Sequence, residues 1–123
     1  MKLIANPTHE ELTSAAVEAA GLLASGQLDA LASAYGYALA FDRGISAAVR
    51  QDLEACLKEL GATSLSPPLS PPVVQRFDPN SSGLLAQVSC QLPAGAGHVL
   101  LELVVTAKGA NSHVSLEQLT AVA

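Results

Sequence analysis

The spacing of apolar residues changes once along this chain of 123 residues, at a proline-rich stretch over residues 62–72. Before it, over residues 8–61, apolar residues recur at the spacing of amphipathic helices. After it, over residues 73–122, apolar and polar residues alternate, which predicts strands with one buried face. We therefore expect a single α+β domain over residues 1–123, with two to three N-terminal helices packed on a C-terminal four-stranded antiparallel meander sheet.

The helical part carries its own start and stop residues. Thr8 followed by Glu11 predicts a capping box at the start of the first helix, and Ser25-Gly26 predicts its end. Ser46 is the expected N-terminal cap of the third helix, which Gly61 ends in a left-handed conformation.

Residues 28–41 lie between these helices and fit two structures. Alanine content and length favour a helix, whereas Gly36 in the middle weakens that prediction. The alternation along YGYALAF also fits a strand. Four side chains at the end of this segment and directly after it are candidates to line a pocket between helices and sheet: Tyr35, Tyr37, Phe41 and Asp42.

Four strands are predicted after the proline-rich stretch, over residues 73–78, 84–92, 99–107 and 113–122. The three connectors between these strands, DPNSSG, PAGAG and KGANS, are turn-forming, so neighbouring strands should pair antiparallel. The alternation slips at Glu117-Gln118, which indicates a β-bulge.

One face of this sheet should remain free of helices. If Leu92 pairs with Val99, the register places Leu85 opposite Thr106 and Gln87 opposite Val104, which makes that face partly apolar. A dimer contact, the wall of a shallow pocket and a solvated surface all fit such a face. The interface candidates on it are Leu85, Gln87, Leu100, Glu102 and Val104.

The chain resembles the cystatin-like folds, including the NTF2-like superfamily, in the order of its elements. LLASGQLDALASAYGYALAF is similar to their helical entry, and HVLLELVVTAKGANSHVSLEQL is similar to their closing hairpin. The resemblance covers most of the chain and implies helices packed across a curved antiparallel sheet. It implies no activity, because these domains include enzymes, dimerisation modules and proteins of other kinds.

Composition excludes several classes of function. The net charge is −5 and the six basic residues are scattered, so we expect no nucleic-acid partner. No apolar stretch approaches the ~20 residues that cross a bilayer, and no signal peptide is recognisable, so we expect a cytoplasmic protein with no membrane partner. Abundant alanine indicates a GC-rich bacterial genome. The two cysteines, Cys56 and Cys90, should be buried reduced thiols.

Few residues suggest chemistry. His9, His98 and His113 are not spaced as ligands of one metal ion, and we expect no metal and no cofactor. Glu102 is the best acid–base candidate because it lies mid-strand among apolar residues, but an exposed cross-strand salt bridge to Arg76 or another cation is the favoured explanation, because outward strand positions are ordinarily solvated. We identify no catalytic residue.

The repeated LSPP of the proline-rich stretch has two interpretations. It fits a polyproline II docking motif, and it also fits a stiff joint between a helix and an edge strand. The backbone restriction of proline accounts for the joint without a partner, which favours the joint.

Three functions are compatible with these features. The leading hypothesis is a non-enzymatic binding protein that forms a homodimer through its open sheet face. The second is a small-molecule pocket of NTF2-like type for an apolar ligand, with or without weak enzymatic activity. The third is an acidic, immunity-type protein that captures a basic protein partner.

Overall fold

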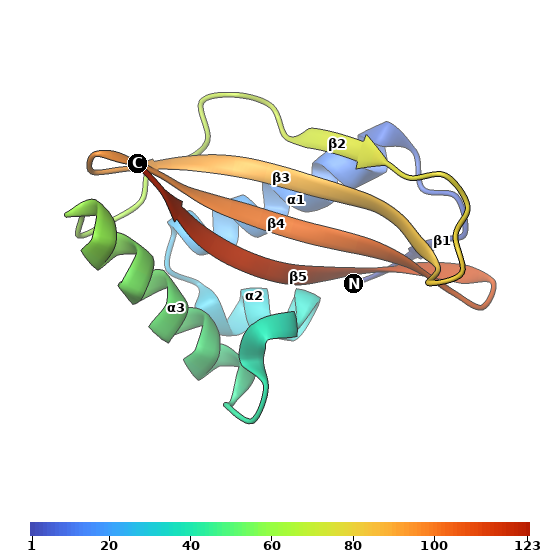
Figure 1. Cartoon of the computed structure of the whole chain (residues 1–123), viewed down its shortest axis with the longest axis horizontal. Helices are drawn as coiled ribbons and strands as arrows, with labels where there is room; N and C mark the ends of the chain where they lie inside the picture. The colour runs from blue at the N-terminus through green and yellow to red at the C-terminus, as the bar shows by residue number, and fades with distance from the viewer.

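Three α-helices and five strands make up the α+β structure, a computed structural model that describes all 123 residues. The helices are α1 (His9–Ala24), α2 (Leu28–Tyr35), the short 3-10 helix η1 (Ala38–Ala40) and α3 (Ile45–Leu60). The strands are β1 (Lys2–Ile4), β2 (Val73–Arg76), β3 (Leu84–Ala94), β4 (Gly97–Lys108) and β5 (Asn111–Val122). All neighbouring strands are antiparallel, in the order β1-β5-β4-β3-β2 (Figure 1).

The helices pack against one face of the sheet. α1 lies against β3 and β2, while α3 lies against β5 and β4. Figure 1 shows α1 behind the strands and α2 and α3 below β5. Along β3 and β4, fully buried residues alternate with partly exposed ones, as expected when only one face is covered. We call the uncovered face of β3, β4 and β5 the open face.

The predicted ends of α1 and α3 are mostly confirmed. The Thr8 Oγ1 accepts from the backbone N–H of Glu11 at 3.1 Å, and Glu11 Oε1 accepts from the N–H of Thr8 at 2.9 Å, so the capping box is complete. Gly61 ends α3 with φ 66°. The prediction of Ser46 as a cap is wrong, because Gly44 takes the extended capping conformation and α3 begins one residue later.

The segment over residues 28–41 is helical only to Tyr35. Gly36, with φ 67°, takes a conformation that other residues avoid and ends α2 while its N–H still bonds to Ala32 O at 2.8 Å. The chain then extends at Tyr37 and closes the short turn of η1. A helix continuing to Phe41 is therefore wrong, and so is a strand.

The sheet has a fifth strand that the sequence analysis did not predict. β1 has three residues, too few to show an alternation, and it pairs with the first residues of β5 at the other end of the chain. The N–H of Val114 bonds to Met1 O at 2.6 Å. Only this distant pairing defines the strand. The other four strands were predicted, although β2 ends at Arg76 and the other three are longer than expected.

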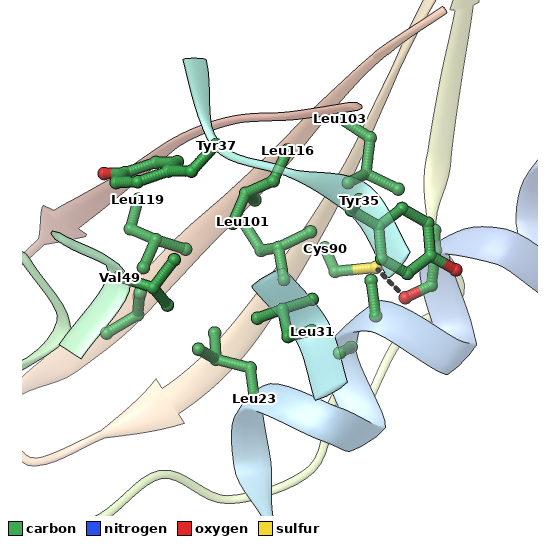
Figure 2. Close-up of a cluster of buried hydrophobic side chains, with 14 of the residues drawn as sticks. Leu23, Leu31, Tyr35, Tyr37, Val49, Cys90, Leu101, Leu103, Leu116 and Leu119 are labelled. Carbon is green, nitrogen blue, oxygen red and sulfur yellow. Dashed lines mark hydrogen bonds between the residues drawn. The ribbon is translucent and has the colours of Figure 1, made fainter. Parts of the chain in front are cut away.

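One hydrophobic cluster of 28 buried residues fills the space between the layers (Figure 2). Alanines of α1, including Ala16, Ala19 and Ala20, are fully buried and allow the helix to approach the sheet closely. The hydroxyl of Tyr35 donates within this core to Ala15 O at 3.0 Å and Glu18 Oε1 at 2.8 Å. Aliphatic side chains supply most of the cluster, as the scarcity of aromatic residues requires.

Both cysteines are free and buried, as predicted. The Cys90 thiol donates to Ala16 O at 3.7 Å (Figure 2), and burial raises its pKa to about 11. Burial also raises the pKa of Cys56. At neutral pH both are therefore protonated thiols that pack as small apolar side chains.

The proline-rich stretch connects α3 to β2. The N–H of Ser66 bonds to Pro93 O at 2.9 Å, which fastens the stretch to the part of β3 that β2 does not cover. Leu69, between the two proline pairs, is 90% exposed. The stretch therefore lies along one sheet edge, where missing N–H donors do no harm to the ladder.

Two glycine substitutions should change stability in opposite directions. A Cβ at Gly97 would overlap the backbone of Val122 and approach Ala123 Cα to 2.8 Å, so Gly97→Ala should lower the free energy of unfolding by about 2 kcal/mol or more. Gly21 lies inside α1 with nothing within 4 Å of a Cβ, so Gly21→Ala should raise it by about 0.5–1 kcal/mol. Urea unfolding followed by circular dichroism measures both. Equal effects of the two variants would contradict the close approach at Gly97.

Candidate functional site

The centre of the open face lies on β4, the middle strand of the sheet. Leu100, Glu102 and Val104 point away from the helices there, and each is partly exposed. The expected register is confirmed on this side, since Leu92 is opposite Val99 and Gln87 is opposite Val104. The face therefore combines two aliphatic side chains with one carboxylate at its centre.

The structure places Leu85 elsewhere. A bulge in β3 leaves Leu85 without a partner, and Leu84 takes the expected place opposite Thr106. Leu85 instead packs against the buried cluster. An extra residue in one strand turns the following side chains over, so the register derived from Leu92 does not extend through the bulge. Four of the five interface candidates therefore share the open face, and Leu85 does not.

Glu102 is held by two glutamines. Gln118 Nε2 donates to Glu102 Oε1 at 2.8 Å, and Gln87 Nε2 donates to Glu102 Oε2 at 2.9 Å. The predicted partner Arg76 is engaged elsewhere, donating to Pro7 O at 2.6 Å. The expectation of an Arg76 salt bridge is therefore wrong, and the carboxyl group is held in a fixed orientation between two amide donors.

The bulge in β5 decides which residue meets Glu102. Leu103 is opposite Leu116, so an unbroken ladder would place Glu117 directly opposite Glu102. Like charges at such positions destabilise a sheet. The bulge leaves Glu117 unpaired and brings Gln118 opposite Glu102, which replaces a repulsion with a hydrogen bond. The predicted slip at Glu117-Gln118 is confirmed. It is also the sequence feature that could have identified Gln118, which we did not select.

The four pocket candidates do not surround a common cavity. Tyr35 and Tyr37 are buried in the core (Figure 2), whereas Asp42 is exposed and Phe41 is 80% exposed. The Tyr35 hydroxyl is bonded as described, and the Tyr37 hydroxyl donates to Asp52 Oδ2 at 2.5 Å. Burial, followed by these hydrogen bonds, raises the pKa of both tyrosines, so both hydroxyls stay protonated.

Asp52 is the centre of a second polar group that the sequence analysis missed. Arg43 donates to both carboxylate oxygens, Nη1 to Oδ1 at 2.9 Å and Nη2 to Oδ2 at 3.2 Å. Arg43 Nη2 also donates to Leu39 O at 2.5 Å. Arg43 therefore connects Asp52 on α3 to the turn of η1. The hydrogen bond from Arg43, and then that from Tyr37, lowers the pKa of Asp52.

This group stabilises a strained turn. Phe41, with φ 52°, is the one residue other than glycine with a positive φ. Such a conformation costs about 1–3 kcal/mol and persists only where surrounding contacts impose it. The bonds from Arg43 to the carbonyls of Leu39 and Ala40, on the preceding residues, are such contacts. Stabilisation of this turn therefore explains the grouping of Asp52, Arg43 and Tyr37 in structural terms.

No three side chains of His, Cys, Asp or Glu come together in a way that could hold a metal ion. None of the helices has the length and apolarity that a membrane-spanning segment needs. Comparison with protein-family models, with curated proteins and with solved structures finds no match to this chain. We therefore take the open face, where two glutamines hold the Glu102 carboxyl group, as the candidate functional site.

Replacing Asp52 should weaken the fold in a pH-dependent way. A lowered carboxyl pKa contributes stability that is present above the unfolded value and is lost as pH falls through the folded value. We expect Asp52→Asn to lower the free energy of unfolding by about 1–2 kcal/mol at pH 7, with a difference that shrinks below about pH 4. Urea unfolding at several pH values measures this. Asp42→Asn, at an exposed carboxylate with no hydrogen bond, is the control and should stay within about 0.5 kcal/mol. A loss independent of pH would contradict the ionic role of Asp52.

Replacing Glu102 should test the network on the open face. Glu102→Ala removes the acceptor of both glutamines, and we expect it to lower the free energy of unfolding by about 1–2 kcal/mol. Gln91→Ala is the matched control, because Gln91 is exposed on β3 with no side-chain hydrogen bond. Chemical unfolding of both variants provides the comparison, and similar small losses would mean that the network contributes nothing.

Proposed function

We propose that this chain is a non-enzymatic binding domain that forms a homodimer through its open face. The observation that carries the proposal is the position of Leu100 and Val104 at the centre of a face that no helix of the same chain covers. In a sheet packed on both sides, both aliphatic side chains would be buried. A second copy of the same face would cover them.

The polar part of the face suits such a contact. An interface tolerates polar groups when they are hydrogen-bonded, and both oxygens of Glu102 already accept from glutamine amides of the same chain. The arrangement needs no reorganisation on association, which limits the entropy lost when two faces meet. The Glu102 carboxyl group would then determine how the two faces are oriented and add little to the affinity of the dimer.

A two-fold axis that passes Val104 in the plane of the contact, at right angles to β4, fits these residues. It would place Val104 against its own copy and each Leu100 farther out along β4. Glu102 is two residues from Val104, about 7 Å along the strand, so the two carboxylates would lie about 14 Å apart. That separation exceeds the screening length of about 8 Å at physiological salt, so their repulsion would be weak.

The homodimer is preferred over the two other hypotheses on structural grounds. A pocket between helices and sheet loses support because Tyr35 and Tyr37 are buried with bonded hydroxyls while Phe41 is on the surface. Capture of a basic partner is favoured by the net charge of −5, but not by the open face. The centre of the open face carries one hydrogen-bonded carboxylate and no acidic cluster.

Val104→Asp should convert the dimer to a monomer. The wild type should have twice the chain mass of 12.5 kDa in light scattering, and the variant the mass of one chain, because a new charge at the centre of the contact would be desolvated. Val17→Asp is the matched control, since Val17 is 58% exposed on α1, and it should remain dimeric. Circular dichroism confirms that both variants fold. A wild type with the mass of one chain, or a dimeric Val104→Asp, would refute the proposal.

A further inference from the structure

Three basic side chains gather at one corner of the sheet, where β1 meets the hairpin between β4 and β5. Together with two neighbouring polar residues they line a hollow of about 300 Å³ that has no apolar side chain in its wall. We call this hollow the basic corner, and its residues are Lys2, Lys108, Asn111, Ser112 and His113. It lies at the Lys108 end of the open face, four residues along β4 from Val104, so the proposed dimer would cover it and binding there is a property of the single chain.

Strand pairing brings these side chains together. Lys2 is directly opposite His113, which is in turn directly opposite Thr106, so the three share one face. Lys108 is two residues beyond Thr106 and therefore lies on the same face, diagonal to His113. The basic residues are scattered in sequence, as predicted, but two of the six meet here because β1 pairs with β5.

No carboxylate neutralises the basic corner. The single salt bridge of the protein joins Arg43 to Asp52, so neither Lys2 nor Lys108 has an acidic partner within 4.0 Å. Partial burial, and then the positive charges of the Met1 amino group and Lys108, lower the pKa of His113. The cations therefore repel one another, and a bound anion would remove that repulsion.

We propose that the basic corner binds a phosphate group. Two ammonium groups offer a charge that matches a phosphate dianion, and the Asn111 amide and His113 imidazole add directional donors. The Ser112 hydroxyl already donates to Ile4 O at 2.7 Å, so Ser112 lines the hollow but has no free hydrogen-bond donor for the phosphate. None of the lining residues is hydrophobic, so we expect the site to recognise the phosphate group more than any organic group attached to it.

Protonation of His113 should strengthen the binding of a phosphate of given charge, whereas protonation of the phosphate dianion, with a pKa of about 6, weakens it. The charged groups that face this imidazole are Lys2 from β1, the Met1 amino group directly before β1, and Lys108 from β4. All are positive, so they favour the neutral imidazole until an anion binds. Phosphate in the corner should therefore raise the pKa of His113, and by linkage protonated His113 should strengthen phosphate binding.

Titration of the full chain with inorganic phosphate, followed by two-dimensional NMR at constant ionic strength, tests the proposal. We expect saturable shifts at Lys2 and over residues 108–113, together with a rise in the pKa of His113. Lys108→Gln should weaken binding about tenfold or more, since it removes a charged donor. Lys58→Gln is the matched control, because Lys58 is exposed on α3 far from the corner in the fold, and it should leave binding unchanged.

Further titrations separate the possible outcomes. Phenyl phosphate should bind about as tightly as inorganic phosphate if the phosphate group alone is recognised, and tighter binding of the ester would show that the ligand is a phosphorylated metabolite. Acetate should bind at least tenfold more weakly, and equal binding of acetate would overturn the choice of phosphate. Absence of saturation, or equal losses in Lys108→Gln and Lys58→Gln, would overturn the site. Repeating the titration with Val104→Asp makes the result independent of the proposed dimer.

Discussion

The two-sided role of β4 is the constraint on which the rest of this structure depends. One set of its side chains, Val99, Leu101, Leu103 and Val105, is fully buried against the helices. The residues between them point to the open face. Because β4 pairs with β3 on one side and β5 on the other, it cannot slip without exposing the whole buried set. The candidate site is therefore positioned by the same register that holds the core.

Two bulges decide which residues that register offers to the outside. Because of the bulge at Leu85, this leucine packs against the core and not on the open face, and Leu84 lies on the open face in its place. The bulge at Glu117 keeps two carboxylates from meeting and supplies Gln118 as a donor to Glu102. Both are single extra residues in otherwise regular ladders. The polarity of the face thus depends on strand irregularities as much as on the residues themselves.

Features that depend on local chemistry were predictable from the sequence. The capping box at Thr8, the glycine that ends α3 and the alternation along β4 involve residues within a few positions of each other. The slip near Glu117 was visible because it breaks a long alternation. The bulge at Leu85 was not, because it falls at the start of β3, where too few residues precede it to show a break. The turn at Phe41 was not predictable either, since Arg43, which bonds to Leu39 O within the turn, is held in place by Asp52 of α3.

The basic corner shows why a site can remain hidden in a sequence whose elements are mostly predictable. Its cations come from opposite ends of the chain, and only the pairing of a three-residue strand joins them. β1 adds little apolar burial, since Ile4 is 57% exposed and Leu3 is only partly covered. It nevertheless places Lys2 beside His113 and Lys108 with no carboxylate between them, an arrangement whose repulsion opposes folding. An anion bound in the hollow would remove this repulsion and stabilise the fold. β1 therefore contributes least to the core but is essential to the basic corner, because it supplies Lys2.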